Sequence, residues 1–155
     1  MYYLSIIKLL SVILGTEILI IVSIIAAMVK ELHLNLDGGR FNKIAQPEAD
    51  ELLITGKGAN GQCRLLLSAS ASLPLIYFTS KNKPSPMTAP NFCMLLRKHI
   101  GSARVSDIRQ PGMECVVMFE LEHLNELGDP CKKVLIMELM GKHSNIIFCD
   151  DKGMI

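Results

Sequence analysis

The side chains with the clearest chemical potential in this sequence are cations that lie between residues 40 and 109. This block holds ten basic and four acidic side chains, a net charge of +6, whereas residues 110–155 have a net charge of −4. Arg97 and Lys98 are adjacent within the block, and Arg109 closes it. Cations gathered on one face would attract a phosphate backbone at low salt. The block therefore favours an anion-binding surface, with a scattered and solvated surface as the alternative.

Side chains that could act as nucleophiles or metal ligands form no recognisable set. His143 precedes Ser144, but the sequence places no acid beside them, so we expect neither nucleophilic catalysis nor enzyme activity. The five cysteines are odd in number and at least 16 positions apart, which argues against a disulfide framework and a zinc site. We expect reduced thiols, no metal and no cofactor.

Residues 4–29 are almost wholly apolar and raise the question of a membrane anchor. Lys8 and Glu17 interrupt this run, and its longest uncharged stretch, 18–29, has twelve residues. A membrane-spanning helix needs about 20. We expect residues 1–22 to be a hydrophobic extension of a cytoplasmic protein, with membrane anchoring by residues 4–29 as the alternative.

A first helix is expected to end at the glycine pair 38–39. Its apolar residues recur at i, i+4, i+7 and i+11, the spacing of one helix face. They are Ile25, Val29, Leu32 and Leu36. Glycine tolerates the left-handed backbone that often follows a helix, so Gly38 provides the stop.

A second helix is expected to place Arg97 and Lys98 in its last turn, where cations also suit the helix dipole. It opens at Pro90, whose missing N–H costs little at that position, and it ends at Gly101. The stripe predicted to face the core comprises Phe92, Leu95, Leu96, His99 and Ile100.

Eight strands are expected around the second helix. Four precede it, at 41–45, 51–54, 63–68 and 75–79, and four follow it, at 104–109, 115–122, 134–140 and 145–149. The short links, rich in Gly, Pro and Asn, favour antiparallel hairpins over helical crossovers. The sequence thus predicts an α+β fold, an antiparallel β-sandwich with an N-terminal helix and one internal helix.

Three separated segments resemble the motifs of one protein family in the same order and spacing. They are residues 36–47 (LDGGRFNKIAQP), 90–99 (PNFCMLLRKH) and 138–147 (ELMGKHSNII). The family is NFACT, also called the fibronectin-binding protein A family. The resemblance covers roughly residues 23–155 and corresponds to the N-terminal NFACT domain. It implies a hydrophobic extension, 1–22, followed by that domain, 23–155. Compared with full-length family members, the chain would be truncated before their C-terminal regions. It also implies a fold similar to the N-terminal domain of formamidopyrimidine-DNA glycosylases.

The resemblance implies a ribosome-associated cytoplasmic factor that is not an enzyme. Its partners would be tRNA and the large ribosomal subunit holding a stalled peptidyl-tRNA, and it would promote alanine tailing at the C-terminus of the stalled chain. The missing C-terminal family regions would be supplied in trans. Older descriptions of the family imply the alternative, a membrane-anchored surface adhesin that binds fibronectin.

Two positions depart from the family motifs. Ile21-Val22 stand where members have Asp-Gly just before the first helix, which would start here near Ser23. Glu114-Cys115 stand where members have the Asp-Arg pair needed for tRNA-dependent tailing, and a thiol does not replace the planar charged fork of arginine. We therefore expect a fragment or degenerate copy that does not support tailing alone. The RNA-binding residues expected on these grounds are Arg97, Lys98, Arg109, Glu114, Cys115 and Lys142.

Overall fold

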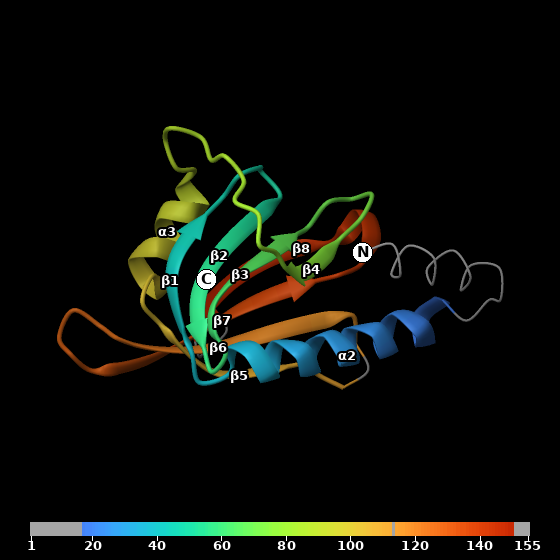
Figure 1. Cartoon of the computed structure of the whole chain (residues 1–155), viewed down its shortest axis with the longest axis horizontal. Coiled ribbons are helices and arrows are strands. Elements are labelled where there is room, and N and C mark those ends of the chain that lie inside the picture. Colours follow the sequence, from blue (N-terminus) through green and yellow to red (C-terminus); the bar gives the residue numbers. More distant parts are fainter. Residues whose placement is uncertain (1–16, 113, 151–155) are drawn as a thin grey trace.

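The computed structural model describes residues 17–112 and 114–150, which form helices packed on a single antiparallel sheet (Figure 1). The helices are α2 (Glu17–Leu36) and α3 (Asn91–Ile100), with a short 3₁₀ helix, η1 (Gly141–His143). The strands are β1 (Arg40–Ala45), β2 (Glu51–Gly58), β3 (Gly61–Ser68), β4 (Leu75–Phe78), β5 (Arg104–Arg109), β6 (Val116–Leu124), β7 (Pro130–Glu138) and β8 (Asn145–Asp150). The expected α+β fold, with four strands on each side of the internal helix, is confirmed.

The eight strands form one hydrogen-bonded sheet in the order β4-β3-β2-β1-β5-β6-β7-β8. The sheet is two meanders joined through their first strands, because β1 pairs with β5 in the register Arg40↔Arg104. Backbone bonds from Gly38 N to Val105 O (2.9 Å) and from Phe41 N to Ala103 O (3.0 Å) reinforce this junction. The strands expected for the sandwich therefore all belong to one continuous antiparallel sheet.

One main core joins the two meanders. It combines buried side chains from α2, α3 and both halves of the sheet, such as Phe41 in β1 and Phe119 in β6, each fully buried. Burying one such side chain stabilises the fold by roughly 1.5–3 kcal/mol. In β6 the alternate residues Val117, Phe119 and Leu121 are buried, which is the period of a strand with one face on the core. Neither meander could cover its inner face alone.

The buried face of α3 differs from the predicted stripe. Cys93, Leu96 and Ile100 are buried, whereas Leu95 is 39% exposed. The face is rotated because α3 packs on β1 and β6, and the Cys93 thiol lies 3.6 Å from the carbonyl oxygen of Ile44 in β1. Phe92 is half-buried and packs at the edge of the core.

The first helix also differs from the expectation at its start. The described part of α2 already includes Glu17, six residues before Ser23, and no glycine or proline interrupts the helix between Ile18 and Leu36. Its C-terminal end is as predicted, with Gly38 at a φ of 74°. The part of segment 4–29 before Glu17 lies outside the described residues. Within those residues, no helix combines the length and apolar character needed to cross a bilayer.

The end of α2 packs closely on the end of β2. A Cβ atom added at Gly58 would overlap the carbonyl oxygen of Asn35 and lie 3.2 Å from the Cα of Leu36. Leu36 itself is buried. Glycine at position 58 therefore allows the last turn of the helix to rest on the sheet.

Candidate nucleic-acid interface

A cleft of about 580 Å³ lies where the last turn of α3 meets the starts of β1 and β5 and the end of β6. Its lining includes four arginine and lysine side chains: Arg40, Arg97, Lys98 and Arg104. Glu122 is the only carboxylate that lines it among the described residues. We refer to it below as the basic cleft, defined by these five side chains. Its excess of positive charge makes it suited to a polyanion.

Neutral backbone groups orient two of the four cations. Arg97 donates from Nε to the carbonyl oxygen of Ile44 at 2.7 Å, and Arg40 donates from Nη1 to that of Ser102 at 3.3 Å. These bonds fix the side chains without neutralising their charge. Of these four side chains, only Arg104 has a carboxylate partner among the described residues, Glu122 at 3.7 Å, and this pair is exposed enough to be screened by solvent.

Two histidines complete the wall of the basic cleft. Burial, followed by the charges of Lys133 and Lys98, lowers the pKa of His99, so its ring is neutral at pH 7 and packs 5.9 Å from the ring of Phe148. His123 lies 3.1 Å from the carbonyl oxygen of Leu124 through Nδ1, while its buried Nε2 has no partner in the described structure. A buried polar atom without a partner favours a ligand that supplies one.

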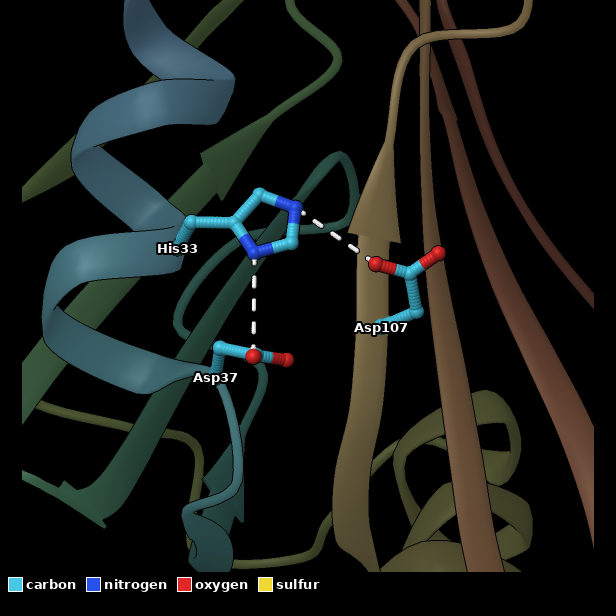
Figure 2. A group of neighbouring side chains, drawn as sticks. All are labelled: His33, Asp37 and Asp107. Atoms are coloured by element: carbon cyan, nitrogen blue, oxygen red, sulfur yellow. Dashed lines mark ion pairs between the residues drawn. The ribbon is translucent and has the colours of Figure 1, made fainter.

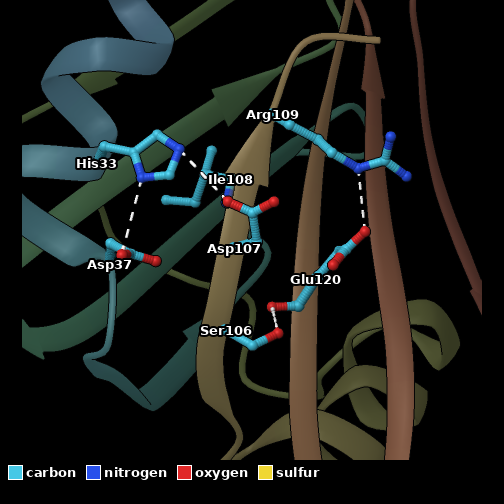
Figure 3. A network of polar contacts seen from close by, with 7 residues as sticks. All are labelled: His33, Asp37, Ser106, Asp107, Ile108, Arg109 and Glu120. Carbon is cyan, nitrogen blue, oxygen red and sulfur yellow. Dashed lines mark hydrogen bonds and ion pairs between the residues drawn. The ribbon is translucent and has the colours of Figure 1, made fainter.

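Arg109 does not line the basic cleft. Arg104 and Arg109 begin and end β5, so about 16 Å of extended strand separates them. The Nε of Arg109 lies 3.0 Å from Glu120 Oε1 in an exposed ion pair (Figure 3). The structure thus brings Arg97 and Lys98 together with Arg40 and Arg104, but not with Arg109.

The other three expected site residues lie at the same end of the sheet as Arg109. Glu114 and Cys115 belong to the turn between β5 and β6, and Lys142 lies in η1 between β7 and β8. Glu114 and Lys142 are exposed. Burial raises the pKa of the Cys115 thiol, so at neutral pH it contributes no charge. The six predicted residues therefore occupy two separate regions.

Sequence reasoning missed Arg40 as a site residue. It lies in the first resemblance segment, but only the long-range pairing of β1 with β5 places it beside Arg104. The clustering of basic residues in 40–109 was the available signal. It did not reveal which of the ten cations converge.

One group outside the basic cleft has the residue types of a metal site. Candidate ligand atoms of His33, Asp37 and Asp107 lie within 4.8 Å of one another. Figure 2 shows the imidazole between the two carboxylates, with Nδ1 3.8 Å from Asp37 and Nε2 3.5 Å from Asp107. The three side chains are all well exposed, at 38–43% of their surface. We interpret the group as an exposed link between α2 and β5, worth at most about 1 kcal/mol.

The fold and the basic cleft define an α+β domain with a positively charged cleft at one end, and comparison with known families agrees with the sequence motifs. A family model described as "NFACT N-terminal and middle domains" matches residues 22–155. The chain therefore belongs to the NFACT family.

Curated relatives include the "Rqc2 homolog RqcH" of Bacillus subtilis, 40% identical over 125 residues, which are 79% of this chain and 22% of that protein. The protein of the same name from Streptococcus suis is 37% identical over 123 residues, again 79% and 22% of the two chains. The "Archaeal Rqc2 homolog aRqcH" of Methanocaldococcus jannaschii is 30% identical over 134 residues, 84% of this chain and 19% of that protein. The chain thus spans about one fifth of the length of these relatives.

Solved structures show the same fold. The N-terminal domain of fibronectin-binding protein PavA from Streptococcus pneumoniae has a TM-score of 0.81 and 35% identity, covering 84% of this chain and 49% of that one. The N-terminal part of the fibronectin/fibrinogen-binding protein from Streptococcus suis has a TM-score of 0.78 and 36% identity, covering 80% and 46%.

Proposed function

We propose that this chain is a non-enzymatic RNA- and ribosome-binding domain of a ribosome quality-control factor, and that the basic cleft contacts RNA phosphates. The observation that supports this most is the convergence of Arg40, Arg97, Lys98 and Arg104 on one cleft with a single carboxylate. The names of the RqcH relatives favour the same role. The partners we propose are tRNA and the large ribosomal subunit with stalled peptidyl-tRNA, in the cytoplasm.

The geometry of the basic cleft suits a sugar-phosphate backbone better than a base edge. The guanidinium groups of Arg40 and Arg97 are oriented by backbone carbonyls, and the remaining N–H groups of each fork are available to phosphate oxygens. Phosphate contacts of this kind set position and affinity without reading sequence. We therefore expect tRNA binding that depends strongly on salt and weakly on tRNA identity.

Two assays between 50 and 200 mM salt test the proposal: filter binding with tRNA and co-sedimentation with large ribosomal subunits. For a few phosphate contacts, affinity should fall by about one decade or more over this range of salt. We expect binding at the low-salt end that weakens linearly on a log–log plot. A folded sample that binds neither tRNA nor large subunits at low salt would contradict the proposal.

The Glu114-Cys115 turn supports a narrower proposal, that this chain does not promote tailing alone. Cys115 is neutral, and its backbone oxygen accepts from Leu139 N at 2.8 Å, so the turn is tied to the end of β7. We expect the variant Cys115→Arg to bind tRNA roughly two- to fivefold more tightly, because it adds one cation near Arg109 and Lys142. The measurement is the same filter-binding titration, with Ser85→Arg as the control, at an exposed loop position that does not line the basic cleft. Equal gains in both variants would show a non-specific charge effect.

The names of the solved neighbours favour a second candidate, a module that binds fibronectin. Surface plasmon resonance on immobilised fibronectin separates the two candidates. Saturable fibronectin binding together with no tRNA binding at low salt would favour this alternative.

A further inference from the structure

A second cleft, of about 300 Å³, lies at the other end of α3 from the basic cleft, beside the first turn of the helix. It is formed by the link between β1 and β2, the start of β2, the first turn of α3 and the start of β8. The side chains used below are Gln46, Asp50, Glu51, Phe92 and Asn145, and we call this site the acidic cleft. The three segments that resemble family motifs meet here, through Gln46, Phe92 and residues 144–146.

The charge of this cleft is the opposite of that of the basic cleft. Its described lining contains two carboxylates, Asp50 and Glu51, and no Lys, Arg or His. Glu51 already binds a cation of the chain itself, since Lys83 Nζ donates to its Oε2 at 2.6 Å. No hydrogen bond or ion pair involves the side chain of the neighbouring Asp50 within the described structure. The charge of Glu51 is thus neutralised by Lys83, whereas the carboxylate of Asp50 can pair with a ligand.

A buried acceptor in the same cleft lacks a donor. Gln46 is 8% exposed, and its Nε2 donates to the carbonyl oxygen of Ala49 at 3.0 Å. Its Oε1 has no hydrogen-bond partner in the described structure. Leaving a buried acceptor unsatisfied costs about 1–3 kcal/mol, so such a group is usually completed by a ligand or water. The cleft therefore combines an unpaired carboxylate with an acceptor in need of an N–H group.

We propose that the acidic cleft binds the guanidinium group of an arginine side chain from a basic protein partner. A guanidinium supplies several N–H donors in one plane, enough to reach both a carboxylate and an amide oxygen. The half-buried ring of Phe92 provides an aromatic wall on which such a group can stack. Asp50 and Glu51 would repel an RNA phosphate, so the observations favour a protein partner over a nucleic acid. This site goes beyond the proposed RNA contact and does not depend on it.

The test is an NMR titration of the ¹⁵N-labelled chain with two probes of the same shape, N-acetyl-arginine amide and N-acetyl-citrulline amide. We expect saturable shifts of the Gln46 and Asn145 side-chain amides with the arginine probe, and binding at least about fivefold weaker with the uncharged citrulline probe. Asp50→Asn should weaken arginine binding roughly fivefold. Glu48→Gln is the matched control, because Glu48 is an exposed acid that lies two residues away and does not line the cleft.

Several outcomes would overturn the proposal. Equal weakening by Asp50→Asn and Glu48→Gln would indicate general electrostatic attraction. Equal shifts with the arginine and citrulline probes would remove the charge requirement. Stronger shifts of the same amides with cytidine or adenosine than with the arginine probe would identify the site as a nucleobase pocket. The spectrum also verifies that each variant is folded, and tRNA binding measured in parallel keeps this result separate from that of the basic cleft.

Discussion

The double variant in which Arg40 and Arg104 are both replaced by alanine is expected to bind tRNA about 25-fold more weakly at fixed salt. This value assumes that each lost phosphate contact contributes about 1 kcal/mol to binding. The two residues come from different strands and line the same cleft with Arg97 and Lys98. They stabilise the fold little, because Arg40 makes one exposed hydrogen bond and Arg104 one exposed ion pair. The slope of log affinity against log salt should also fall by about one to two units, since fewer counterions are released. Filter binding over a salt series measures both quantities.

The matched control for this experiment is Lys81→Ala, which removes an exposed cation of the same charge block outside the cleft. We expect its affinity to remain within about twofold of the parent chain. A paired variant at the opposite end of the sheet, Arg109→Ala with Lys142→Ala, locates the interface. If that pair loses more affinity than Arg40 and Arg104, the RNA contact lies beside the Glu114-Cys115 turn and the basic cleft is not the site.

The variant Gly58→Ala is expected to destabilise the domain by about 3 kcal/mol. A Cβ at this position would overlap the carbonyl oxygen of Asn35, so the last turn of α2 must move away from β2 and expose part of Leu36. Gly58 is not among the glycines with positive φ, so alanine itself suits the local backbone and the cost is steric. Alanine would regain only about 0.4–1 kcal/mol through the unfolded state, too little to offset the overlap.

Urea unfolding followed by circular dichroism measures this change as a lower midpoint with an unchanged slope. Ala59→Ser, at the exposed neighbouring position, is the control and should stay within about 0.5 kcal/mol of the parent. A midpoint for Gly58→Ala equal to that of the control would show that α2 does not rest on β2 as described.

The secondary structure could be predicted from the sequence because its signals are local. Short apolar runs located the eight strands, glycines and prolines located the turns between them, and the i, i+4, i+7 spacing located the C-terminal half of α2. Local signals of this kind could not predict which face of α3 is buried. Cys93 becomes a core residue and Leu95 a surface one only because β1 and β6 lie on one side of the helix.

The sites depended on contacts between distant parts of the chain, which no local pattern encodes. Arg40 and Arg104 meet through a strand pair that links the two meanders. Arg109 belongs to the same charge block but lies at the far end of β5, paired with Glu120. The charge count could therefore indicate that a basic surface exists. Only the strand order determines which of the basic residues lie together in the cleft. The same applies to Gln46 and Asn145, which are 99 positions apart in the sequence and which the fold places in one cleft.

The junction between β1 and β5 also has a consequence for the order of assembly. Within each meander, successive strands are neighbours and close over short loops, whereas Arg40 and Ser102, in contact at this junction, are 62 positions apart. Bringing such distant segments together lowers the conformational entropy of the chain, and this loss precedes the favourable contacts that offset it. We expect the hairpins to form early and the junction to close last, and the arginines of the basic cleft meet only at that step. RNA would then bind at this cleft only after folding is complete. A folding intermediate in which β1 and β5 have not yet paired contains the same cations, but they are not assembled into a cleft.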